Sequence, residues 1–173
     1  NYYVTANADG SYTVQGPGET DTLTNIEQAS FDTTGQTLTM AQFVAQSFNP
    51  YEYVASNLEQ LAQGYGANIP VALQHYLQHG FAEGRPTNSF NVYEYVASNP
   101  DLLAAGYGAN LEMSLEHYVL HGYAEGRPTT NFNVYDYVAS NPDLLAAGYG
   151  NNIDAALEGY VQHGYAEGRP TTG

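Results

Sequence analysis

The sequence has no cysteine, no lysine and no tryptophan among its 173 residues. Without cysteine, the chain can form neither a disulfide framework nor a thiolate metal site. Its only cations are three arginines, which against 18 acidic residues give a formal net charge of −15. This balance disfavours binding to nucleic acid or to anionic membrane surfaces, because both need clustered cations. No apolar run approaches the roughly 20 residues of a membrane span, so we expect no membrane insertion.

A signal peptide and an initiator methionine are also lacking, so we expect the chain to be an excerpt or a processed product of something longer. What is present is a repeat. Units of 42 residues begin at Phe48, Phe90 and Phe132 with no insertion between them. Aligned position by position, the second and third units agree at 33 of 42 positions, and the first and second at 27 of 42. A fixed period of this size indicates an array of stacked units over 48–89, 90–131 and 132–173.

The first 47 residues differ from the repeats, and we predict a small β-rich segment over 1–47. The β-prone stretches are Tyr2–Thr5, Ser11–Val14, 22–26 and a pair around Phe31 and Leu38. β-branched and aromatic residues favour strands, so three or four short strands are expected. A sheet this small needs a partner over one face, and the first repeat is the expected partner.

Two stretches resemble parts of known proteins. The segment Gly18–Met40, GETDTLTNIEQASFDTTGQTLTM, resembles one that accompanies calcium-binding nonapeptide repeats in large secreted bacterial proteins, although Thr33–Gly35 stands where that class usually has Asp-Gly. Residues Phe48–Gly173 are similar to tandem Y-x-A-S-x-P-D-L…H-Y-x-x-x-G-x-x-E-G-R repeats of the same class. The resemblance implies one-step (type I) export and an extracellular or cell-surface location. It brings no catalytic residues.

Each unit is expected to form two or three short helices. In the second unit we predict that Asn91, Asn99 and Asn110 cap three successive helices, with Pro100 at the first position of the second. The third helix carries one apolar stripe, made of Leu111, Leu115, Tyr118 and Val119. Helices this short cannot bury such a stripe alone, so neighbouring units must pack against one another.

Histidines lie four residues apart in two units, which places both rings on one helix face at a spacing typical of metal ligands. The pairs are His75 with His79 and His117 with His121. The third unit has Gly159 where the partner of His163 should be, and no carboxylate completes a site. We therefore predict no metal site. The alternative is that His79, His121 and His163 are half-buried structural residues between repeats, near a helix C-terminus whose dipole favours a proton.

The three arginines occur once per unit, each in the sequence Glu-Gly-Arg-Pro. They are Arg85, Arg127 and Arg169. A regularly placed cation in an acidic chain predicts a fixed carboxylate partner. One set of candidates is Glu83, Glu125 and Glu167, and the other is Glu52, Glu94 and Asp136 on the first helix of each unit. Alternatively the guanidinium bonds carbonyl groups at the joint between units. Both interpretations are structural, and capture of an anionic ligand is disfavoured by the surrounding negative charge.

Tyrosine is abundant, with 17 residues. Tyr65, Tyr107 and Tyr149 recur at the repeat spacing and would form a ladder that could stack on sugar rings or bury against another chain. The alternative is partial burial of each ring with its hydroxyl in water.

These observations predict a mainly α protein, a helical repeat array with a small N-terminal β-rich segment. No catalytic constellation is present, so we expect a non-enzymatic protein without catalytic residues or cofactor, with calcium left open by the acidic surface. The function expected is an extracellular structural or adhesive module that forms a homo-oligomer or filament through repeat ends and β-strand edges. The alternative is a carbohydrate-binding accessory module of a secreted bacterial enzyme, with a polysaccharide as partner.

Overall fold

The computed structural model describes residues 48–172 in full and, before them, the backbone of five short strands. The strands are β1 (Tyr3–Ala6), β2 (Tyr12–Gly16), β3 (Glu19–Leu23), β4 (Gln28–Phe31) and β5 (Gln36–Thr39). β1, β2 and β3 pair antiparallel in that order, and β4 pairs antiparallel with β5. The expected packing of this segment as a cap on the first repeat falls outside the described residues and stays a prediction.

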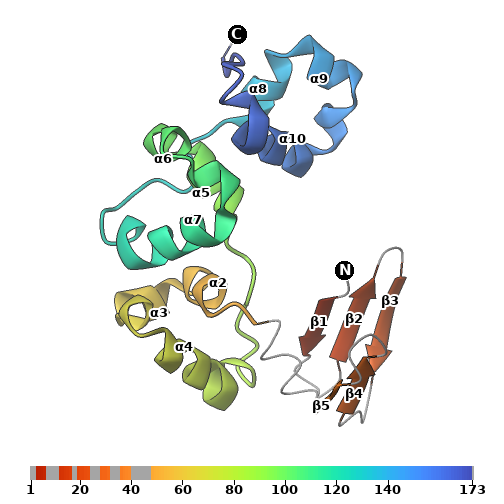
Figure 1. Cartoon of the computed structure of the whole chain (residues 1–173), viewed down its shortest axis with the longest axis vertical. Helices are drawn as coiled ribbons and strands as arrows, with labels where there is room; N and C mark the ends of the chain where they lie inside the picture. Colours follow the sequence, from red (N-terminus) through yellow and green to blue (C-terminus); the bar gives the residue numbers. More distant parts are fainter. Residues whose placement is uncertain are drawn as a thin grey trace. The chain divides into compact units, whose positions relative to one another are not determined.

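The rest of the chain is three similar units of short helices (Figure 1). The first contains α2 (Pro50–Ala55), α3 (Leu58–Ala62), η1 (Tyr65–Ala67), α4 (Ile69–His75) and η2 (Tyr76–Gly80). The second contains α5 (Val92–Ala97), α6 (Pro100–Ala104), η3 (Tyr107–Ala109), α7 (Leu111–His117) and η4 (Tyr118–Gly122). The third contains α8 (Val134–Ala139), α9 (Pro142–Ala146), η5 (Tyr149–Asn151), α10 (Ile153–Gly159) and η6 (Tyr160–Gly164).

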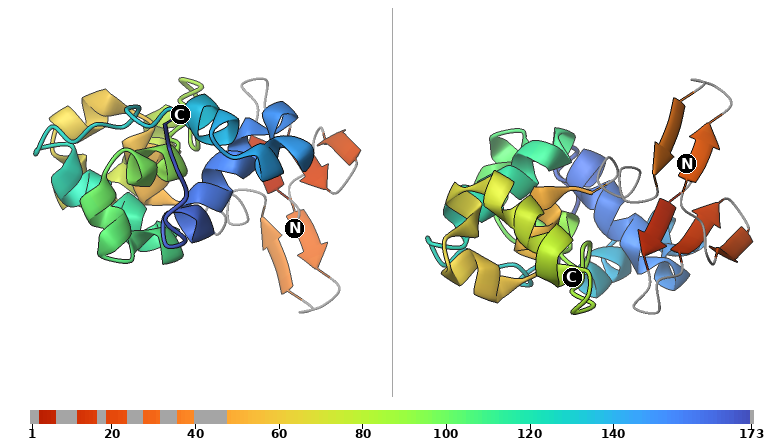
Figure 2. Two further views of the ribbon diagram at one scale, coloured as in Figure 1. Left: turned by 90° about the horizontal axis from the view of Figure 1, so that it is seen from above. Right: turned by 90° about the horizontal axis from the view of Figure 1, so that it is seen from below.

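This arrangement confirms the prediction of a mainly α chain with three repeated units. Within each unit the helices fold back on one another rather than continuing as one long helix (Figure 2). In the second unit Gly106 causes the turn after α6, because its φ of +85° is a left-handed conformation that glycine adopts without steric cost. The chain divides into two compact units, Asn1–Ser89 and Phe90–Gly173.

Helix capping follows the sequence prediction at two of three positions in the second repeat. The Asn91 side chain accepts a hydrogen bond from the Glu94 amide at 3.0 Å, and Asn110 accepts one from Met113 at 3.1 Å. The prediction for Asn99 is wrong, since its side chain caps nothing. Its Nδ2 instead donates to the carbonyl of Tyr95 at 2.7 Å and to that of Pro128 at 2.8 Å. Asn99 therefore ties the end of α5 to the segment that leaves the repeat.

The core of each unit is aromatic. In the second repeat Tyr95 is fully buried, and Phe90 stacks on Tyr118 with ring centroids 4.3 Å apart. Of the predicted stripe, Leu115, Tyr118 and Val119 are buried, whereas Leu111 is half-exposed. The helix that carries this stripe ends in a π-helical turn, where the Tyr123 amide donates to the Tyr118 carbonyl. Each repeat thus has a small aromatic core of its own.

Candidate functional site

The polar centre of a repeat is a buried tyrosine hydrogen-bonded to a histidine. In the second repeat the Tyr95 hydroxyl, from α5, lies 2.8 Å from Nδ1 of His117 on α7. In the first repeat the corresponding distance, between Tyr53 and His75, is 2.9 Å. Gly122 makes this possible, because a Cβ there would collide with the Tyr95 hydroxyl and lie 3.1 Å from its Cζ.

In the second repeat, burial favours the neutral form of both Tyr95 and His117. It raises the pKa of Tyr53 to about 12 and moves the pKa of Tyr95 well above its ordinary value. Burial also lowers the pKa of His117. A neutral tyrosine and a neutral imidazole share this hydrogen bond, with its direction set by the tautomer of the histidine. Because both shifts favour neutral groups at neutral pH, the pair is suited to packing and hydrogen bonding rather than to proton transfer.

The histidine ring is enclosed by a second tyrosine and a second histidine. In the second repeat the edge of Tyr107 meets His117 at 5.0 Å, and the rings of His117 and His121 are 5.7 Å apart. The first repeat has the same arrangement, with the ring centroids of Tyr65 and His79 lying 5.5 and 5.6 Å from that of His75.

The first repeat adds one more polar group. The buried Gln60 places Nε2 3.1 Å from Nδ1 of His75, while its Oε1 is buried with no hydrogen-bond partner in the part of the chain that the structure describes. Leu102 and Leu144 occupy this position in the other repeats. Gln60 is therefore specific to the first repeat.

The third repeat lacks the histidine, because Gly159 stands in its place. Tyr137 remains 2% exposed, and it now lines a pocket of about 170 Å³ together with Tyr149, Gly159 and His163. In the sequence, Gly159 is apparent only as a break in the histidine pattern. The signal that could have revealed the pocket was the deletion of one large side chain from an otherwise matching unit.

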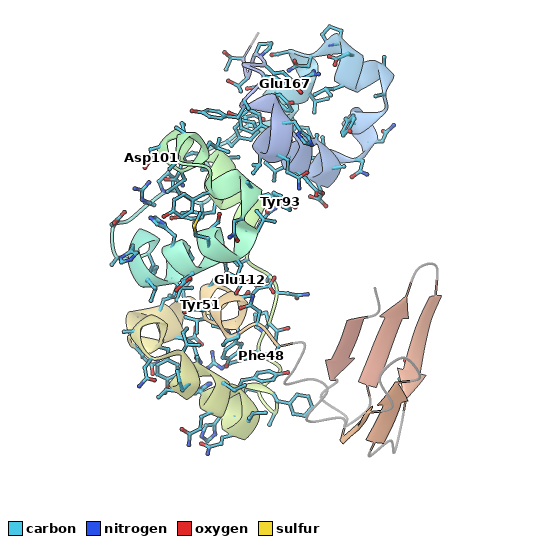
Figure 3. All side chains as sticks on the ribbon, viewed as in Figure 1. Phe48, Tyr51, Tyr93, Asp101, Glu112 and Glu167 are labelled. Carbon is cyan, nitrogen blue, oxygen red and sulfur yellow. The ribbon has the colours of Figure 1, made fainter. Side chains whose placement is uncertain are left out.

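Each arginine pairs with two carboxylates of its own repeat. Nε of Arg127 lies 2.6 Å from Glu125, and Nη1 lies 2.7 Å from Asp101, which Figure 3 labels on α6. Arg169 has the same geometry with Glu167 and Asp143, and Arg85 pairs with Glu83 and Glu59. The first set of candidate partners is thus correct. The second is wrong, because the other carboxylate comes from the second helix rather than from Glu52, Glu94 or Asp136.

We expect Arg127→Ala to lower the free energy of unfolding by about 1 kcal/mol, and less in high salt, because both carboxylates are at least half exposed. Denaturant unfolding at low and high ionic strength measures this. Since the carboxylate partners of Arg127 lie in its own repeat, its predicted role at the joint between units stays a prediction. An unchanged unfolding midpoint would argue against any structural role for this arginine.

The last histidine of each repeat is more exposed than predicted. His79, His121 and His163 are exposed rather than half-buried, and the partly buried histidines are His75 and His117. Their part between repeats stays a prediction. Within residues 48–172 and the five strands, no group of three or more histidines and carboxylates could hold a metal ion.

The tyrosines of the predicted ladder are half-buried. Tyr65 and Tyr107 pack against the histidine of their own repeat, and Tyr149 lines the pocket of the third. Partial burial is the alternative that the sequence left open for these rings. Their binding to a partner stays a prediction.

The second and third repeats, which belong to one compact unit, meet at a joint between α5 and η3 of the second and α10 and η6 of the third. Tyr93, labelled in Figure 3, donates its hydroxyl to Glu158 at 3.0 Å and accepts from Gln162 at 3.4 Å. Burial and Glu158 raise the pKa of this tyrosine. At Gly108 a Cβ would lie only 2.6 Å from the Val161 carbonyl oxygen, so the two backbones approach closely here.

No protein-family model, curated protein or solved structure matches this chain. The resemblance to secreted bacterial repeats therefore stays an expectation. Among the described residues, no helix is long and apolar enough to cross a membrane.

Proposed function

We propose that the chain is a non-enzymatic extracellular repeat module that assembles with itself by repeating the joint between its second and third repeats. The observation that carries this is an acceptor face on the third repeat, made of Tyr135, Leu145 and Gly150. These residues correspond to Tyr93, Leu103 and Gly108, which form the second repeat's side of the joint.

The two versions of this face differ in exposure. Leu103, which lies near Val161 at Gly108, is 7% exposed, whereas Leu145 is 51% exposed and Tyr135 is 68% exposed. Burying apolar surface of this kind stabilises an association by roughly 25 cal/mol per Å² before its entropic cost. The third repeat thus exposes a face whose counterpart on the second repeat packs against a neighbouring repeat.

The first repeat offers a suitable cover. Its Leu77, which corresponds to Val161 at the joint, is 53% exposed. Gln74 and Gln78 correspond to Glu158 and Gln162, so the two side chains that would meet Tyr135 are both neutral amides. In a chain with net charge −15, a neutral docking face avoids like-charge repulsion between copies.

Such a contact joins two different faces of the molecule. An interface of this heterologous kind leaves the same pair of faces open on the growing assembly, so copies can add end to end into a filament. The short β-strands near the N-terminus are proposed to add edge contacts between copies.

Gly150→Ala tests the proposal. At the joint, the corresponding Cβ would collide with an incoming carbonyl, but in the single chain the nearest atom to a Cβ at Gly150 is Leu145 Cδ2, at 3.7 Å. We therefore expect this variant to unfold at an unchanged temperature and to stay monomeric where the parent associates. Sedimentation velocity over a wide concentration range measures association.

Gly108→Ala is the matched control, because it strains the internal joint and should destabilise the monomer itself. If the parent chain is monomeric at every concentration, or if Gly150→Ala associates as the parent does, assembly through this face is wrong.

A second candidate function is carbohydrate binding, favoured by the exposed ring of Tyr135. A sugar that stacks on this ring would show saturable affinity that Tyr135→Ala abolishes and Gly150→Ala retains. Calcium remains open as a structural ion in this function, as the resemblance to secreted proteins suggests.

A further inference from the structure

We propose that the pocket of the third repeat binds a small, neutral, aromatic nitrogen heterocycle of the imidazole type, in the position that the first two repeats fill with their own histidine ring. The shared chemistry is an imidazole ring, either free or carried by a histidine of another polypeptide. This site is distinct from the acceptor face and does not depend on self-assembly.

The first two repeats show the bound state of such a ring. Nδ1 of His117 is hydrogen-bonded to the Tyr95 hydroxyl at 2.8 Å, and the His117 ring lies against the edge of Tyr107 at 5.0 Å. His75 has the corresponding two partners: the Tyr53 hydroxyl lies 2.9 Å from its Nδ1, and the Tyr65 ring lies 5.5 Å from its ring. The repeats therefore contain a recurring imidazole-binding arrangement of one buried hydroxyl and one aromatic edge.

The third repeat keeps this arrangement and lacks only the ring. The backbone at Gly159 is helical, with φ −59° and ψ −38°, against −58° and −45° at His117. A Cβ built at Gly159 would meet no atom within 4 Å. Tyr137 and Tyr149, which correspond to Tyr95 and Tyr107, both line the pocket. The space of the missing side chain has thus not collapsed.

The Tyr137 hydroxyl can donate a hydrogen bond to an acceptor in the pocket. The residue is 2% exposed, and its hydroxyl has no hydrogen-bond partner within residues 48–172. The oxygen itself is not fully buried, because Gln60 Oε1 is the one fully buried, unpartnered side-chain oxygen or nitrogen among the described residues. Burial raises its pKa, so the group remains an O–H donor at neutral pH. An acceptor nitrogen in the pocket would take the place of water at this hydroxyl.

The other residues that line the pocket favour a neutral ligand over a charged one. Leu144 supplies an apolar surface, and the Arg169 guanidinium at the pocket is already paired with Glu167 and Asp143. Neither an anion nor a cation therefore finds a free opposite charge among these groups. His163 provides one further ring, as His121 does beside His117.

The size of the pocket limits the ligand and its affinity. About 170 Å³ accommodates a five-membered ring with one or two waters. A ligand of five non-hydrogen atoms gains at most about 1.5 kcal/mol per atom, so a dissociation constant in the millimolar range is expected.

Titration of the full chain with imidazole, followed by NMR at about pH 8 where imidazole is mostly neutral, tests the site. We expect saturable shifts at Tyr137, Tyr149 and His163. Gly159→His should abolish them by filling the pocket. Tyr137→Phe should weaken binding about fivefold, through loss of one hydrogen bond. Pyrrole, a ring of the same size without an acceptor nitrogen, should bind more weakly than imidazole.

The second repeat supplies an internal control. His117→Gly should create a second site, with new saturable shifts at Tyr95 and Tyr107. Comparison of free imidazole with N-acetyl-histidine methylamide distinguishes a small-molecule ligand from a peptide-borne one. If the parent shows no saturable shifts in the third repeat, or if Gly159→His shows the same shifts, the pocket holds water alone and the proposal is overturned.

Discussion

Replacing Gly122 by alanine should lower the free energy of unfolding by about 2 kcal/mol. The added methyl group would collide with the Tyr95 hydroxyl and press on Cζ at 3.1 Å. Tyr95 is fully buried and its hydroxyl is held by His117, so the ring cannot move aside without breaking that bond. Steric strain therefore exceeds the gain of about 0.5–1 kcal/mol that alanine brings to a helix. Thermal or urea unfolding of the full chain measures the loss.

Gly159→Ala is the matched control in the third repeat. It adds the same methyl group to a helical backbone where a Cβ meets nothing within 4 Å. We expect this variant to be as stable as the parent or more stable by up to about 1 kcal/mol. Equal losses for the two variants would show that glycine is needed at both positions for its backbone and that the tyrosine contact is irrelevant.

Asn99→Ala should cost about 2–4 kcal/mol, because it leaves two carbonyl groups without their donor. The Asn99 side chain is 4% exposed and donates to Tyr95 and Pro128 at once. The Tyr95 carbonyl lies in the last turn of α5, where the helix supplies no amide for it. The substitution would also release the segment that leads to the third repeat.

Asn91→Ala is the control for Asn99→Ala, since it removes one exposed capping bond and should cost about 1 kcal/mol. Urea unfolding of both variants at the same pH gives the comparison. If Asn99→Ala were no more destabilising than Asn91→Ala, the two buried bonds would contribute little beyond an ordinary cap.

Pattern and local chemistry were sufficient for part of this protein. Capping by Asn91 and Asn110 depends on residues three apart, so it can be predicted from spacing alone. The turn at Gly106 and the pairing of Arg127 with Glu125 are local in the same sense. Asn99 misled the prediction because an asparagine before Pro-Asp is a typical cap, whereas its bond to Pro128 joins residues 29 apart.

The repeat pattern also led to an expectation that the structure modifies. Each unit was expected to rely on its neighbours to bury its apolar side. The structure shows that Phe90, Tyr95 and Tyr118 already form a core within one unit. Leu103, which lies near Val161 of the next unit at Gly108, is 7% exposed, whereas the corresponding Leu145 is 51% exposed. Dependence between neighbours is therefore partial.

By itself, the sequence determined the three helical units of 42 residues, the acidic surface and the places where helices begin, because these follow from periodicity, composition and contacts a few residues apart. Only the tertiary structure decided which histidine lies beside a buried tyrosine, which second carboxylate pairs with each arginine, and that one missing side chain leaves a pocket. Those outcomes depend on atoms brought together across 15 to 30 residues of chain. At that separation, spacing along the sequence does not specify which side chains meet or how far apart they lie.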